Sequence, residues 1–206
     1  MAPPHFRRHK KRIRADLSWN LTTALSEFLD NIKTNYNTYI DCEKNTDGIQ
    51  SISIEDNIPD GINKINIDIN DEENPMTFGC ESDTHNDDNC LNKFGYGFKD
   101  AAVAVCEKLT IFTKIDVDNI IQYWKVVFDF TKMEINIDQH QSWFPTYITQ
   151  TDESEYRTYK KHDVHGSVMI MENFRPDFKT RKIDAIFEDI NKSYNKQIEK
   201  GRKIFT

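Results

Sequence analysis

Apolar residues recur at intervals of three and four positions in two stretches of this chain, which is the pattern of a helix with one buried face. The first stretch covers residues 21–36 and the second covers residues 183–194. A third run, residues 98–108, is small and apolar, follows two closely spaced glycines, and predicts another helix. The pattern therefore predicts three helices that can pack on a common core.

Apolar and polar residues instead alternate over residues 49–54 and 62–69, and the turn-forming residues 57–61 lie between them. This pattern predicts a β-hairpin with one covered face. Runs of apolar, β-branched and aromatic residues predict further strands over residues 109–113, 120–130 and 166–171. The acidic residues 70–92 predict a long lid or binding loop, and residues 138–163 show no assignable pattern.

This order of elements predicts an α+β fold, a two-layer α/β sandwich in which helices pack on one face of a mixed sheet. The chain has 206 residues, of which 37% are hydrophobic, and this is enough material for one core. We expect a single domain over residues 17–206, preceded by a flexible arm over residues 1–16. No following transducer domain is expected.

The arm contains a cluster of basic residues, namely Arg7, Arg8, Lys10, Lys11, Arg12 and Arg14. The net charge of −7 argues against nucleic acid binding by the whole surface. The cluster itself is compatible with a solvated arm, a nuclear address or a nucleic acid contact through residues 7–14.

Neither a membrane-spanning apolar run nor the apolar core of a signal peptide is present in the sequence. The four cysteines show neither metal-binding nor disulfide spacing. We therefore expect an intracellular protein, cytoplasmic or nuclear, that does not bind membranes.

Gly95 and Gly97 directly precede the helix predicted over residues 98–108. Because glycine has no Cβ, backbone N–H groups in this segment can approach a ligand closely. The start of the helix directs its positive dipole end and its free N–H groups to the same place, and Lys99 adds a charge. The segment predicts an anion-binding loop, while an ordinary turn is the alternative when the glycines are considered alone.

Glu27 and Asn31 are four residues apart on the first predicted helix, so they share one face. A carboxamide oxygen is a suitable ligand for Mg²⁺, and a carboxylate can orient or deprotonate a water molecule. A solvated polar stripe is the alternative for this pair alone.

Taken together, Glu-x-x-Asp-Asn over residues 27–31, a hairpin followed by an Asp loop, and Phe-Gly-x-Gly-Phe-Lys over residues 94–99 resemble the GHKL ATPases. This superfamily comprises gyrase, heat-shock chaperone, histidine kinase and MutL-type ATP-binding domains. Within it, the segments 75–79, 82–83, 94–99 and 111–114 are most similar to the microrchidia (MORC) ATPases. The resemblance covers residues 17–194 and implies the Bergerat-type ATP-binding fold, with ATP and Mg²⁺ as cofactors.

The resemblance also implies roles for individual residues. Glu27 would be the general base that activates the attacking water, and Asn31 would be the Mg²⁺ ligand. Asp71 would accept a hydrogen bond from the adenine amino group, Met76 would lie against the base, and Ser167 would support adenine binding through its hydroxyl. The phosphates would be held by Phe94, Gly95, Gly97, Phe98 and Lys99.

The sequence departs from the family pattern at Asp71-Glu72-Glu73-Asn74-Pro75, where Asp-x-Gly-x-Gly is expected. Glu73 and Pro75 replace the two glycines, which favours weak ATP binding and slow hydrolysis. The leading hypothesis is a Mg²⁺-dependent ATPase that acts as a conformational switch, as a homodimer or with a protein partner. The alternative is a degenerate, non-hydrolysing GHKL module with a binding or regulatory role.

Overall fold

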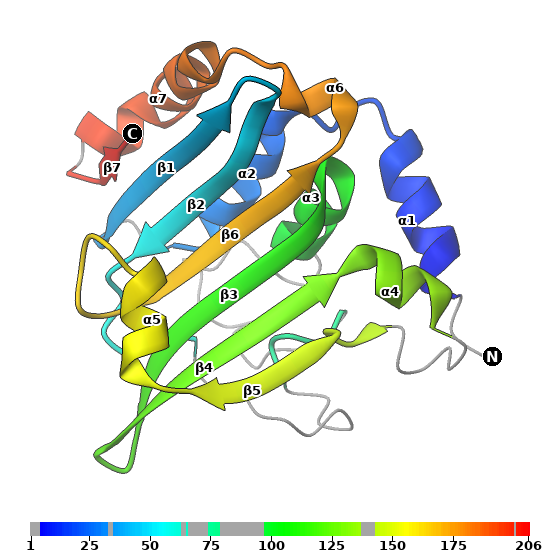
Figure 1. The fold of residues 1–206 in the computed structure, drawn as a ribbon. Coiled ribbons are helices and arrows are strands. Elements are labelled where there is room, and N and C mark those ends of the chain that lie inside the picture. The colour runs from blue at the N-terminus through cyan, green and yellow to red at the C-terminus, as the bar shows by residue number, and fades with distance from the viewer. Residues whose placement is uncertain are drawn as a thin grey trace.

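The structure is a computed structural model that describes residues 5–32, 35–62, 65, 74–78, 97–136, 143–199 and 201–206. Its centre is a mixed sheet of seven strands (Figure 1). The strands are β1 (Asn37–Asn45), β2 (Gly48–Asp56), β3 (Cys106–Val117), β4 (Ile120–Asp129), β5 (Tyr147–Thr151), β6 (Ser167–Phe174) and β7 (Lys203–Phe205).

The strand order is β5-β4-β3-β6-β2-β1-β7. Every neighbouring pair is antiparallel except β1 and β7, which are parallel. Strand β6 therefore joins two hairpins, β1–β2 and β3–β4, into one sheet although it follows both of them in the sequence. This long-range pairing brings the ends of β2 and β6 together at the centre of the sheet.

The helices are α1 (Phe6–Ala15), α2 (Leu21–Asp30), α3 (Gly97–Val105), α4 (Phe130–Ile135), α5 (Glu153–Tyr159), α6 (Pro176–Lys179) and α7 (Ile183–Glu199). Helices α2 and α3 lie on one side of the sheet, and the short helix α5 lies on the other (Figure 1). The main core lies on the α2 and α3 side, whereas Tyr156 of α5 packs on the opposite face with Phe112 and Val168. The predicted α+β two-layer fold is confirmed.

Several predicted elements are confirmed with shifted ends. Helix α2 ends at Asp30 rather than at residue 36, and it begins after Asn20, whose side chain accepts a hydrogen bond from the Thr23 N–H at 2.9 Å. This N-cap satisfies one of the free N–H groups at the helix start. Helix α7 and strand β3 contain the segments predicted for them, and β4 and β6 each lack one predicted end residue. Helix α3 ends at Val105, so the last three residues of the helix predicted over 98–108 belong to β3 instead.

The predicted hairpin between residues 49–54 and 62–69 is wrong. Strand β2 contains the first of these segments, but it pairs with β1 on one side and with β6 on the other. Both of its edges are therefore occupied by other strands. Strand β1 was not predicted because its burial does not alternate regularly beyond Ile40. Most of residues 62–69 lie outside the described part of the chain.

The prediction of a flexible arm is wrong for residues 6–15, which form α1. Phe6 is fully buried, and its ring contacts those of Phe78, Phe130 and Trp143 at centroid distances of 5.5, 6.2 and 5.7 Å. The buried face of this helix was not predicted from the sequence because one of the basic residues, Lys10, is itself buried on it. The Lys10 ammonium lies 2.8 Å from Glu107 and 3.0 Å from Glu134.

Arg14 also belongs to the interior contacts of α1. Its guanidinium donates to the carbonyl oxygens of Val103 and Cys106, each at 2.9 Å, and to Glu107 at 2.5 Å. A cation at the last carbonyls of α3 complements the negative end of that helix dipole. Helix α1 is thus held by the aromatic packing of Phe6 and by hydrogen bonds and ion pairs of its basic residues with α3, β3 and α4. Within residues 138–163, β5 and α5 are further elements that the sequence did not predict.

Phe6→Ala is expected to lower the free energy of unfolding by about 3–5 kcal/mol, because it removes a fully buried aromatic ring. Deletion of residues 1–14 should destabilise the fold at least as much. Urea unfolding measures both effects. Arg8→Ala, on the exposed face of the same helix, is the control and should stay within about 0.5 kcal/mol of the parent. A shortened protein as stable as the parent would contradict the role of α1.

Candidate functional site

Glu27 and Asn31 lie at the C-terminal end of α2, as predicted. The Asn31 side-chain nitrogen donates to the Glu27 carbonyl oxygen at 2.5 Å, which fixes the orientation of the carboxamide. Glu27 is half-buried. Burial raises the pKa of its carboxyl group, and the negative charges of Asp30 and Asp100 raise it further. A carboxylate with a raised pKa is a better proton acceptor at neutral pH than an ordinary surface glutamate.

The C-terminal end of the chain holds this end of α2 in place. Arg202 is buried and donates to the carbonyl oxygens of Leu29 at 2.5 Å and Ile32 at 3.4 Å. Tyr194 of α7 donates to the Ser26 carbonyl at 3.1 Å, and its hydroxyl lies 2.7 Å from the Asp30 carboxylate. The orientation of the Glu27 and Asn31 pair therefore depends on residues more than 160 positions away.

Helix α3 begins at Gly97 and packs beside α2, with the rings of Phe98 and Phe28 at 5.7 Å. Lys99 is fully buried, and its ammonium donates to the Thr77 carbonyl at 2.6 Å. The same ammonium lies 5.3 Å from the ring centroid of Phe98. The lysine predicted for phosphate binding thus also anchors residues 74–78 to α3.

Met76 lies in this anchored segment and is almost completely buried. Its N–H donates to the Asn74 side-chain oxygen at 3.1 Å, which forms a local turn. The structure therefore brings Met76 to α3, next to the residues predicted for the phosphates. Asp71, Phe94 and Gly95 lie outside the described residues, so their predicted roles stay predictions.

Ser167 is the first residue of β6. It contacts Asp56, a residue for which the sequence predicted no role. The Ser167 N–H donates to Asp56 Oδ1 at 3.2 Å, and the Ile58 N–H donates to the same oxygen at 2.9 Å. The Ser167 hydroxyl forms a hydrogen bond with that of Thr113 at 2.8 Å. Both Asp56 and Ser167 are buried. A carboxylate and a hydroxyl thus lie together at the ends of β2 and β6.

Two glycines allow the backbone to close around this carboxylate. Gly166 has φ +92°, and a Cβ there would lie 2.2 Å from the Asp56 carbonyl oxygen. Gly61 has φ +56°, and a Cβ there would lie 2.2 Å from the Lys114 carbonyl oxygen. A side chain at either position would therefore need both an unfavourable φ and a displaced strand. Next to Gly61, the Ile62 N–H donates to Thr113 Oγ1 at 2.9 Å.

Burial raises the pKa of Asp56 from its ordinary value of 3.8 to about 6, although two backbone N–H groups and Lys160 favour the charged form. Its hydrogen bonds to other described residues all end on Oδ1. Oδ2 can therefore accept a hydrogen bond from a ligand without disturbing these contacts. The group therefore fits a ligand that presents an N–H or O–H donor.

The sequence did contain a pattern that could have identified Asp56. The residue directly follows the alternating segment 49–54, and Gly61 comes five positions later. These residues were interpreted as the turn of a hairpin because residues 62–69 also alternate. The sequence therefore predicts the carboxylate for the adenine amino group after residue 69, at Asp71.

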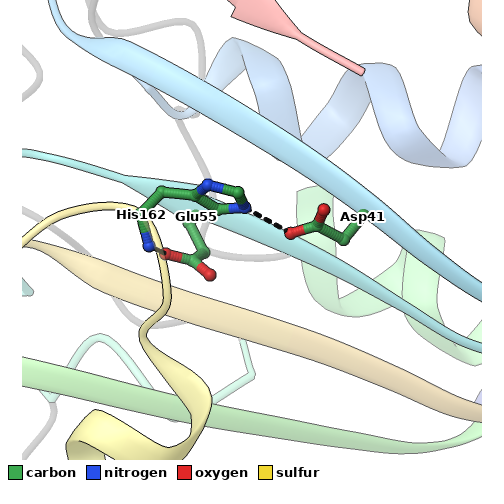
Figure 2. A group of neighbouring side chains, drawn as sticks. All are labelled: Asp41, Glu55 and His162. Carbon is green, nitrogen blue, oxygen red and sulfur yellow. Dashed lines mark hydrogen bonds and ion pairs between the residues drawn. The ribbon is translucent and has the colours of Figure 1, made fainter.

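Asp41, Glu55 and His162 form a second cluster, in which candidate metal-ligand atoms lie within 4.8 Å of one another (Figure 2). The Glu55 carboxylate, however, already accepts from the Lys160 ammonium at 3.1 Å and from the N–H groups of Lys161 and His162. His162 Nε2 lies 2.7 Å from Asp41. The cluster attaches residues 160–162 to β1 and β2, and the Lys160 ammonium already balances the charge of the Glu55 carboxylate.

The comparison with known protein families agrees with this arrangement of helices and strands. Residues 19–158 match the family model described as histidine kinase-, DNA gyrase B- and HSP90-like ATPase. The chain belongs to this GHKL ATPase family. The match spans α2, with Glu27 and Asn31, as well as Asp56 and α3. No curated protein sequence matches the chain.

Family membership identifies this protein as an ATP-binding module of the ATPase type. The sheet, with α2 and α3 on one face, agrees with that fold. None of the described helices combines the length and the hydropathy that a transmembrane segment requires.

The raised pKa of Asp56 predicts a pH-dependent stability. Because this pKa is higher in the folded than in the unfolded protein, ionisation opposes folding. The opposition is absent well below the unfolded pKa of 3.8, grows as the pH rises from there to about 6, and stays constant above that value. At pH 7, the free energy of unfolding of the Asp56→Asn variant should therefore exceed that of the parent by up to about 3 kcal/mol.

The stability difference should shrink as the pH falls below 6 and disappear at about pH 3, where Asp56 is largely protonated in both states. Urea unfolding of parent and variant between pH 3 and pH 8 measures it. Other groups that titrate in this range contribute equally to both curves, so their contributions cancel in the difference. A pH-independent difference would contradict the raised pKa.

Proposed function

We propose that this GHKL module binds Mg²⁺-ATP, with adenine at Asp56 and Ser167 and the phosphates at the start of α3. The hydrogen bond between the Ser167 N–H and Asp56 is the observation that carries the proposal. The resemblance in the sequence implies that a carboxylate and a hydroxyl at the start of a late strand act together on adenine. Asp56 fits this carboxylate because it ends β2 beside Ser167.

Adenine presents an exocyclic amino group, which is a hydrogen-bond donor. Asp56 Oδ2 can accept from it, while Oδ1 stays bonded to the two backbone N–H groups. The backbone bonds fix the carboxylate before a ligand arrives, so little orientational freedom is lost on binding. Above its pKa of about 6, the carboxylate is ionised and acts only as an acceptor.

The phosphate end of the ligand would lie where α3 begins. The N–H groups at Gly97 and Phe98 are at the positive end of the helix dipole, which favours an anion. Asn31 supplies an amide oxygen of the type that Mg²⁺ accepts as a ligand. The metal would neutralise phosphate charge at this place. Glu27, four residues earlier on α2, can then take a proton from an attacking water.

The departures from the family pattern bear on affinity and rate. Asp-x-Gly-x-Gly beginning at Asp56 would require glycines at positions 58 and 60, where Ile58 and Asp60 stand. Gly61 provides one left-handed backbone position close by. We expect weak binding and slow turnover from the isolated chain. A basic residue from a partner or a second copy would accelerate hydrolysis by stabilising the transition state.

The similarity to the microrchidia ATPases, the conformational switch and the cytoplasmic or nuclear location stay predictions, as does a homodimer. The nucleic acid contact now depends on fewer cations, because Lys10 and Arg14 are engaged with Glu107. The remaining basic residues of α1 are Arg7, Arg8, Lys11 and Arg12. The degenerate, non-hydrolysing module remains the alternative, and the tests below separate it from an ATPase.

Asp56→Asn is expected to abolish detectable ATP binding, because the carboxamide can place a donor opposite the adenine amino group. Calorimetric titration with ATP, with and without Mg²⁺, measures the effect. Asp71→Asn is the matched comparison, since Asp71 is the carboxylate that the sequence predicted. If only the Asp71 variant loses binding, the adenine position proposed here is wrong. If the parent itself does not bind ATP, the proposed function is wrong.

Glu27→Ala is expected to bind ATP nearly as well as the parent and to release no phosphate above background, because only the proton acceptor is removed. Asn31→Ala should instead lose the increase in ATP affinity that Mg²⁺ gives the parent. Steady-state phosphate release and titration with and without Mg²⁺ separate the two effects. Equal turnover by the parent and the Glu27 variant would favour the non-hydrolysing module.

A further inference from the structure

His9 on the inner face of α1 contacts the helix that is proposed to bind phosphate. Its imidazole is buried, and Nε2 lies 2.6 Å from Asp100 Oδ1. Asp100 belongs to the first turn of α3, three residues after Gly97. Residues 91 positions apart in the sequence thus form a nearly water-free hydrogen bond beside the proposed phosphate position.

The hydrogen-bond partners define how this imidazole acts. Arg12 Nη2 lies 3.2 Å from His9 Nδ1. A guanidinium can only donate, so Nδ1 must be the acceptor, and the hydrogen is on Nε2. His9 therefore donates to the Asp100 carboxylate. The rings of Trp143 and Phe78, at centroid distances of 5.1 and 6.0 Å, surround the imidazole and restrict its rotation.

Asp100 is in a position where its charge opposes nucleotide binding. Helix side chains lean towards the N-terminus of their helix, so a carboxylate in the first turn approaches the free N–H groups there. These are the groups that a phosphate would use. The negative charge of Asp100 also reaches Glu27 on α2, where it contributes to that residue's raised pKa.

Helix α1 is attached firmly enough to hold this carboxylate. Lys10 contacts Glu107 and Glu134, and Arg14 donates to backbone carbonyls at the end of α3. The attachment of α1 thus extends along α3, from Asp100 in its first turn to Cys106 at the start of β3.

We propose that His9 is a positioning residue that holds the Asp100 carboxylate on the α1 side of α3, away from the phosphates. The inference rests on the proposed nucleotide site. Without His9, the carboxylate is free to turn to the N–H groups of its own helix, where it competes with the phosphates and repels them.

His9→Ala is therefore expected to weaken ATP binding by about 10-fold at low salt, as an uncompensated charge near the triphosphate would. Added salt should reduce the loss, because mobile ions screen the repulsion. His9→Gln keeps a donor and should retain most of the affinity. In an Asp100→Asn background, His9→Ala should have almost no effect, because the repelling charge is gone.

Titration with ATP and with inorganic tripolyphosphate measures these affinities, and urea unfolding verifies that each variant is folded. Ile13→Ala is the matched control, since Ile13 is also buried on α1 but its side chain has no hydrogen-bond donor for Asp100. It should lose stability and keep the parent's affinity. Equal losses of affinity in the Ile13 and His9 variants, or the same loss in the Asp100→Asn background, would overturn the positioning role while leaving ATP binding intact. Failure of the parent to bind either ligand would overturn the proposed function and this inference together.

Discussion

Glu55 and Lys160 form an ion pair from which water is fully excluded, and the arrangement of the site depends on it. Removal of two charges from water is costly, and only complete hydrogen bonding compensates for it. Glu55 achieves this by also accepting from the N–H groups of Lys161 and His162. The pair thereby fixes the segment between α5 and β6 to the end of β2. Glu55 would be an uncompensated buried charge if Lys160 were absent.

The two consecutive carboxylates at the end of β2, Glu55 and Asp56, bind different segments of the chain. Their side chains point to opposite faces of the sheet, because successive residues of a strand alternate. Glu55 holds residues 160–162, and Asp56 holds Ser167, at the two ends of the same connection. Glu55 accepts from the Lys160 ammonium and from two backbone N–H groups, whereas the hydrogen bonds of Asp56 to other described residues all end on Oδ1. The protein thus tolerates a destabilising group at the position where a ligand can use it.

The sequence predicted the elements whose patterns arise from local periodicity. The segments of α2 and α7 were predicted because their apolar residues follow the helical period. Strands β3, β4 and β6 were predicted because they are runs of apolar, β-branched and aromatic residues, and β3 and β6 are each buried over five consecutive positions. Glu27 and Asn31 were found because their spacing places them on one helix face. Family patterns then supplied roles that the residue types alone leave open.

The sequence did not predict elements that long-range contacts determine. Helix α1 contains buried His9 and Lys10, whose polarity indicates exposure unless their partners on α3 and α4 are known. The pairing of β2 was assigned to the next alternating segment because local pattern gives no information on strand partners. The sequence therefore predicted the carboxylate at Asp71, whereas the contacts in the structure led us to propose Asp56. For both α1 and the pairing of β2, contacts between residues distant in the sequence determined the structure, and local propensity did not.

The attachment of α2 and α3 to different parts of the chain has a consequence for folding. Helix α3 is held by α1, through contacts such as the one between His9 and Asp100, which are 91 positions apart. The carbonyl end of α2 instead needs Arg202, which is 173 positions from Leu29. Contacts between residues so far apart in sequence form slowly, because a long loop must close before the contact can stabilise it. The start of α3 can therefore become ordered before the end of α2 that carries Glu27, so the two halves of the proposed site are fixed in separate folding steps.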